Sequence, residues 1–268
     1  MLFAAAKTIP VGDHPYWHLA GLTIDEDIVL GTLLAAAIFL GLGVWMRKKL
    51  TDGVPSKIQI VWEVLTEQVS ELADSAIGPQ GRRFVPVGVT LFLFILICNW
   101  LDFLPTALRP GQSGDIFPAP TSDVNLPLAM ALFVIVWAHV ESFRARGFRG
   151  YFRHYAQPFK ALAPINVIEE ITKPITLTFR LFGNIFSGGL MLVVMLTLLP
   201  IYVTPPLEIV WKFFDTGLLG TIQAFIFTLL TMLYFGFAMS HDEAHEAHEA
   251  HEAHEPAAPA PLAHEVLQ

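Results

Sequence analysis

Charged residues are scarce in this sequence. Only 15% of its 268 residues are charged and 54% are apolar, whereas a soluble protein usually carries about 25% charged residues. This composition excludes an ordinary soluble domain and offers no basic surface for nucleic acid. It predicts a protein embedded in a lipid bilayer.

Cysteine is nearly absent, and so are several catalytic signatures. Cys98 is the only cysteine, which excludes an internal disulfide and a cysteine-based metal cluster. No phosphate-binding loop is visible, so nucleotide chemistry is expected elsewhere. Secondary transporters usually show internal repeats, and none is visible here. An intramembrane hydrolase needs a nucleophile–base pair, and His139 has no evident partner of this kind at membrane depth. We interpret His139 as a satisfied polar residue near the end of a span.

The negative charge is concentrated at the end of the chain. Seven of the 24 acidic residues follow Ser240, and Ala-His-Glu repeats run from Ala244 to Glu255. Sequence of this kind cannot build a core, so a disordered, solvated tail is predicted for 240–268. Histidine and glutamate also bind metals, and a metal-binding tail is the alternative. A repeat of period three defines no site, so we expect no metal.

Apolar segments long enough to cross a membrane recur along the rest of the chain. A helix needs about 20 residues to span a hydrocarbon core of about 30 Å. An amphipathic surface helix is predicted at 56–76, because apolar residues recur at helical spacing and acids occupy another face. The sequence predicts an all-α membrane protein, with an outside segment 1–27 and a membrane domain 28–239. The expected spans are 28–46, 84–104, 126–142, 163–202 and 206–239.

The last two apolar segments are longer than an upright span requires. A helix of about 40 residues is about 60 Å long. We expect two strongly tilted helices joined near Pro200 and Pro205; kinks near Gly183 or Gly188 are the alternative. Basic residues cluster after the first and third spans, so the positive-inside rule predicts an outside N-terminus and a cytoplasmic C-terminus.

An arginine stands within the fourth apolar segment. Arg180 at the centre of a membrane helix costs roughly 3 kcal/mol or more, so it is a functional candidate. Asn184 shares its face four residues on. Gly183 and Gly188 are small enough to let another surface come close. A buried ion pair that only positions helices is the alternative interpretation.

Four motifs resemble signatures of subunit a of F-type rotary ATP synthases. The most specific is KPITLTFRLFGN at 173–184, which contains Arg180, and QAFIF at 223–227 matches a second signature. NWLDFLP at 99–105 and PTSDVN at 120–125 match two more. The resemblance covers roughly residues 28–239 of a bacterial-type subunit, in order and with family-like spacing.

The resemblance implies a role in ATP synthesis without a catalytic site in this chain. In that family, subunit a lies against a ring of c subunits, each carrying one membrane carboxylate. Two offset half-channels lead protons to and from the ring, and ring rotation drives synthesis. Arg180 would sit between the half-channels and face the ring carboxylate. Further implied partners are b-type peripheral stalk subunits and, indirectly, the catalytic head. The resemblance also implies a location in the bacterial plasma membrane. It implies no cofactor.

The match also implies which residues line the half-channels. For the outside half-channel these are Asn99, Asp102, Thr121, Asp123, Asn125, Asn184 and Gln223. The inside candidates are Glu169 and Glu170, with Thr172 and Thr176 nearby.

The chain departs from some relatives at titratable positions. Gly189 and Thr216 stand where some relatives carry a glutamate and a histidine, and Asn166 replaces a further carboxylate. Asp215, next to Thr216, is the group we expect to take their place. The alternative functions are a secondary transporter, an ion channel subunit or a structural membrane anchor.

Overall fold

The computed structural model describes residues 16–19, 22–51, 53–103, 119–155, 163–200 and 202–239. The predicted tail 240–268 and most of the segment 1–27 lie outside the described residues. Seven α-helices are present in the described part of the chain. They are α1 Glu26–Lys49, α2 Lys57–Ile77, α3 Val85–Trp100, α4 Asn125–Tyr155, α5 Ala163–Leu198, α6 Thr204–Lys212 and α7 Gly220–Met239.

Shorter elements connect these helices. Two four-residue strands, β1 Tyr16–Leu19 and β2 Leu22–Asp25, pair antiparallel just before α1. The 3₁₀ turns are η1 Pro79–Phe84, η2 Leu101–Phe103 and η3 Pro120–Ser122. A π-helix, η5 Phe213–Leu219, joins α6 to α7.

Five helical stretches are long and apolar enough to cross a membrane. This confirms the predicted all-α membrane class and the number of candidate spans. They are Ile28–Lys49, Pro79–Phe103, Asn125–Ala145, Val167–Leu192 and Thr204–Met239.

Local sequence explains where the helices begin and end. Ser56 caps α2 by accepting a hydrogen bond from the Gln59 amide at 3.3 Å, and Gly78 ends it with a φ of 82°. α4 runs past the predicted end of its span to Tyr155, across a break at Gly147 with a φ of 66°. α5 is continuous from Ala163 to Leu198, so no break occurs at its glycines.

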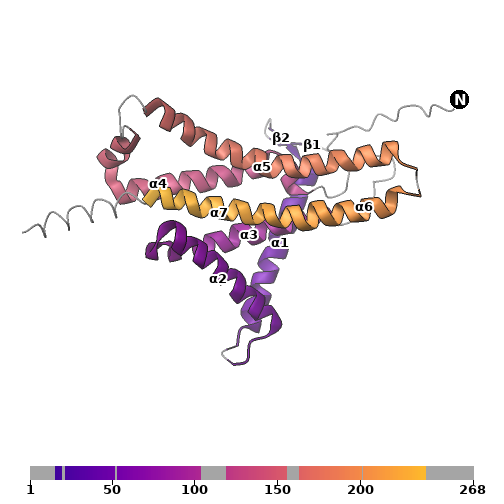
Figure 1. Cartoon of the computed structure of the whole chain (residues 1–268), viewed down its shortest axis with the longest axis horizontal. Coiled ribbons are helices and arrows are strands. Elements are labelled where there is room, and N and C mark those ends of the chain that lie inside the picture. The colour runs from indigo at the N-terminus through magenta and orange to yellow at the C-terminus, as the bar shows by residue number, and fades with distance from the viewer. Residues whose placement is uncertain are drawn as a thin grey trace, which may run out of the picture.

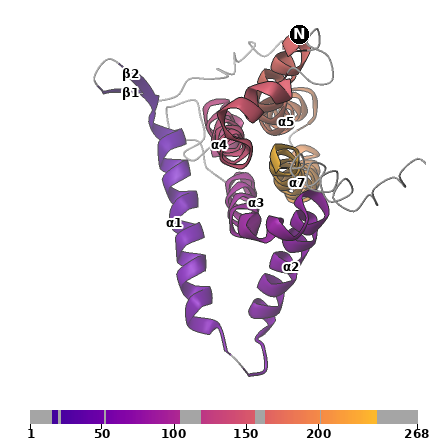
Figure 2. The same cartoon turned by 90° about the vertical axis from the view of Figure 1, so that its left-hand side faces the viewer.

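α1 lies crosswise to the other apolar helices. Figure 2 shows α3, α4, α5 and α7 nearly end-on, while α1 runs across the view. In Figure 1 these four helices run along the horizontal, side by side. α7 contacts α2, α3, α4 and α5, so it forms the centre of this bundle. A single membrane plane therefore cannot be perpendicular to α1 and to the bundle at once.

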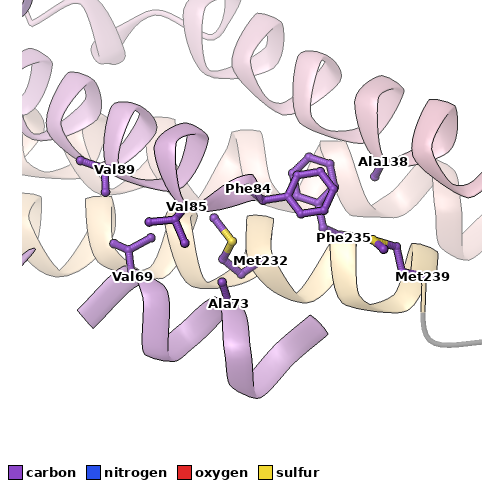
Figure 3. Packing of buried hydrophobic residues seen from close by; sticks show 9 residues of the cluster. All are labelled: Val69, Ala73, Phe84, Val85, Val89, Ala138, Met232, Phe235 and Met239. Carbon is purple, nitrogen blue, oxygen red and sulfur yellow. The ribbon is translucent and has the colours of Figure 1, made fainter. Parts of the chain in front are cut away.

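The C-terminal half of α2 packs against α3 and α7. Phe84 and Phe235 stack with ring centres 4.3 Å apart, and Met232 fills the space between the helices (Figure 3). A Cβ atom at Gly236 would collide with the Ala76 carbonyl of α2, and one at Gly88 would collide with Val69 of α2 and with Met232 of α7. These two glycines therefore permit the close approach of α2. The predicted position of α2 on a membrane surface stays a prediction.

Candidate functional site

Arg180 lies on the exposed face of α5. Leu177 and Leu181 are buried on the opposite face, whereas Phe179 beside the arginine is 59% exposed. Within the described part of the chain, the Arg180 guanidinium forms no hydrogen bond or ion pair. A Cβ atom at Gly183 or Gly189 would meet nothing within 4 Å, so neither glycine is required by packing inside this chain.

Asn99 and Thr121, both predicted site residues, meet in a buried polar cluster. Thr121 Oγ1 donates to Asn99 Oδ1 at 2.8 Å, and Asn99 Nδ2 donates to the Gly220 carbonyl at 2.9 Å. Asn99 is only 1% exposed. The cluster joins α3, η3 and α7, so its hydrogen bonds also fix the positions of these elements.

Asp102 is held by Lys212 at the end of α6 and by Thr216 in η5. Its Oδ1 atom lies 3.1 Å from Lys212 Nζ, and its Oδ2 atom accepts a hydrogen bond from Thr216 Oγ1 at 2.8 Å. Lys212 Nζ also donates to the Asp102 carbonyl at 2.6 Å. The motifs had assigned no role to Lys212. Its spacing of four residues from Thr216, which places both on one helix face, was the available signal.

Asp215 faces the opposite way, toward α5. It is 9% exposed, and a Cβ atom at Gly188 would overlap its carboxylate. Trp211 Nε1 donates a hydrogen bond to the Gly188 carbonyl at 3.3 Å and so links α6 to α5. Asp215 and Thr216 lie in η5, and π-helical turns of this kind recur at functional sites.

The four remaining residues of the outside set lie at three separate positions. Asp123 accepts a hydrogen bond from the Asn125 amide through its carboxylate, at the start of α4. Gln223 is 7% exposed, and its Nε2 atom has no hydrogen-bond partner among the described residues. Asn184 is half-buried on α5, and its carbonyl accepts a hydrogen bond from Ser187 Oγ at 2.9 Å.

Glu170 forms a second charged cluster with Lys173 and His139. Its Oε1 atom lies 2.6 Å from Lys173 Nζ, and its Oε2 atom lies 3.6 Å from His139 Nε2. Lys173 Nζ in turn lies 5.7 Å from the ring centre of Tyr234 on α7. His139 therefore has a polar partner, as expected of a satisfied polar residue near the end of a span, because α4 and α5 bring together residues 31 positions apart.

The remaining inside candidates are exposed on α5. Glu169 is exposed, and the side chain of Asn166 lies outside the described set. Thr176 donates from its hydroxyl to the carbonyls of Thr172 and Lys173, each at 3.0 Å. Its polar atom is therefore bonded to its own helix.

Glu141 is a buried acid that the motifs did not indicate. Arg83 and Arg144 each approach its carboxylate to 3.2 Å, and Trp137 Nε1 donates to it at 3.2 Å. These contacts link η1 to α4, and removal of either arginine would leave the buried Glu141 charge less compensated.

Comparison with known proteins identifies the family. Residues 29–236 match the family described as ATP synthase A chain. ATP synthase subunit a of Acidothermus cellulolyticus is 46% identical over 234 residues, which cover 87% of this chain and 84% of the relative. The Mycobacterium leprae subunit is 43% identical over 245 residues, covering 88% and 96%.

A more distant relative agrees. Subunit a of Desulforamulus reducens is 34% identical over 235 residues, which cover 86% of each chain. These matches set aside the secondary transporter, the unrelated channel subunit and the plain membrane anchor. The chain belongs to the family of ATP synthase subunit a, the proton-translocating stator subunit of the membrane sector, which has no catalytic site of its own.

Proposed function

We propose that the exposed face of α5 lies against a ring of c subunits and that Arg180 faces the membrane carboxylate of each passing subunit. The observation that carries this proposal is an exposed arginine within an apolar helix, unpaired among the described residues. Contact with lipid would cost roughly 3 kcal/mol or more. A partner that carries a carboxylate removes this cost.

The chemistry of a guanidinium suits this position. It stays protonated at any physiological pH, so it cannot relay a proton and blocks direct flow between the two sides. Its charge lowers the pKa of a carboxylate that faces it, and this favours release of the proton there. An ionised carboxylate is costly in lipid, so only protonated ring sites rotate away.

Two separate polar clusters support two half-channels. The outside half-channel would contain Asp215 together with the outside residues that the motifs imply. Its centre would lie near the end of α3 and η5. Those outside residues are Asn99, Asp102, Thr121, Asp123, Asn125, Asn184 and Gln223. The inside half-channel would contain Glu169, Glu170 and Thr176, near the start of α5. The clusters belong to different ends of the helices, as offset access requires.

The arrangement of the helices and the positions of the basic loops support one orientation in the membrane. With α1 along the membrane normal, the bundle lies strongly tilted, because α1 crosses it (Figure 2). We place the N-terminus outside and the C-terminus in the cytoplasm of a bacterial cell. The b-type stalk subunits and the catalytic head complete the complex.

The test is ATP-driven proton pumping by the assembled complex in inverted membrane vesicles. Arg180→Ala should abolish pumping while the c ring still co-purifies. Arg180→Lys should restore it poorly, since a buried ammonium can lose its proton. Normal pumping by assembled Arg180→Ala complex would refute the proposal.

A further inference from the structure

Two carboxylates lie near each other at the outer end of the bundle, and their surroundings differ. Asp102 belongs to η2 at the end of α3, and Asp215 belongs to η5. Among the described residues, Asp102 and Lys212 are the charged neighbours of Asp215. If the proposed function holds, on which this inference rests, protons on the outer side pass through one of these two acids.

Asp102 has both carboxylate oxygens occupied. Lys212 approaches Oδ1, and the Thr216 hydroxyl donates to Oδ2. The same ammonium donates to the Asp102 carbonyl, in a 3₁₀ turn that follows α3, where the negative end of the helix dipole favours a cation. To accept a proton, Asp102 would have to give up a charge-assisted contact. Asp102 and Lys212 therefore form a pair with no net charge, and the Asp102–Thr216 hydrogen bond links η2 to η5.

Asp215 has the opposite character. Its carboxylate accepts no hydrogen bond from the described residues, and it reaches Gly188 on α5. Gly188 follows Arg180 by eight residues, which is about two helical turns. Glycine at 188 leaves the space that the carboxylate fills. Asp215 is therefore the outer acid directed at the helix that carries the arginine.

We infer that Asp215 is the outer proton carrier, and that Lys212 and Thr216 hold Asp102 as a fixed clamp that positions η5. A proton from the outer water binds the Asp215 carboxylate and forms an O–H bond. That bond breaks as the proton passes to the ring carboxylate, and Asp215 returns to the anion. Lys212, Thr216 and Asp102 are positioning residues and keep their protonation throughout.

The experiment measures passive proton flow through the membrane sector of the complex, after removal of the catalytic head from vesicles. Asp102→Asn leaves Lys212 without its counter-charge and should lower flow by about tenfold or more. Asp102→Asn combined with Lys212→Gln removes both charges and should raise flow at least about threefold above that of Asp102→Asn alone, because no unpaired charge is then left at the clamp. Asp215→Asn should abolish proton flow, because an amide cannot take up and release the proton as a carboxylate does.

A second readout separates carrying from positioning. Asp215→Glu should shift the pH dependence of flow, since it changes the titrating group. Thr216→Val removes only one donor of the clamp, so it should lower flow without changing its pH dependence. It also provides the test if the double variant does not assemble.

The possible results are distinct. The inference is overturned if the assembled double variant is as slow as Asp102→Asn, if Thr216→Val shifts the pH dependence, or if Asp215→Asn keeps its flow. The proposed function is tested separately, by proton pumping in the Arg180→Ala complex. A failure of the inference about Asp102 and Asp215 is therefore distinguishable from a failure of the proposed function.

Discussion

Replacement of Gly188 by alanine should displace Asp215. The added methyl group would occupy the position of the Asp215 carboxylate, which must rotate away or push α5 from η5. Overpacking of this kind costs about 1–3 kcal/mol. Alanine recovers about 0.5–1 kcal/mol inside a helix because it restricts the unfolded chain. The midpoints of the two ranges leave a net loss of about 1 kcal/mol.

The assay combines assembly with transport. The temperature at which the subunit leaves the complex should fall for Gly188→Ala, and proton flow should fall with it. Gly41→Ala on α1 is the matched control, since a Cβ atom there meets nothing within 4 Å. Adding Asp215→Ala to Gly188→Ala should restore thermal stability but not flow. Equal stability of Gly188→Ala and Gly41→Ala would refute the packing argument.

Three further predictions concern other parts of the chain. Gly236→Ala should weaken the contact of α2 with α7 by about 1–3 kcal/mol, measured as loss of subunit on heating. Gly43→Ala, with open space around it, should not. His139→Phe should slow ATP-driven pumping by removing the group beside Glu170, whereas His139→Gln should retain more of it; equal rates for both would contradict this. Truncation after Ser240 should leave coupled pumping intact, since all five candidate spans precede it. Loss of pumping in assembled truncated complex would mean that the tail takes part.

Hydropathy predicted the spans because it depends on local composition. The five apolar stretches and the position of the joint near Pro200 follow from residues adjacent in the chain. Asn99 and Thr121 were both named from motifs, and the structure joins them directly. Local patterns therefore predicted the helices, and the motifs named two residues that the fold brings into contact.

The remaining features depend on contacts between distant segments. The Asp102–Lys212 pair joins residues 110 positions apart, and no periodicity indicates such a pairing. The π-helix was not predicted either, because its wider turn is fixed by packing rather than by a recognisable residue. The contact of His139 with Glu170 likewise joins two helices, so the sequence could suggest a satisfied histidine but could not name its partner. The direction of α1 relative to the bundle is also a property of the folded chain.

The crosswise direction of α1 has a consequence for the electric field. If water reaches the bundle from both sides, the dry barrier between the two aqueous phases is about one helix diameter thick, roughly 10 Å. The intact hydrocarbon core is about 30 Å thick. The same membrane voltage would then fall over about a third of the distance and produce a field about three times as strong at Arg180. The work per proton stays at about 2.3 kcal/mol for each 100 mV, but it is delivered where the ring carboxylate changes its charge.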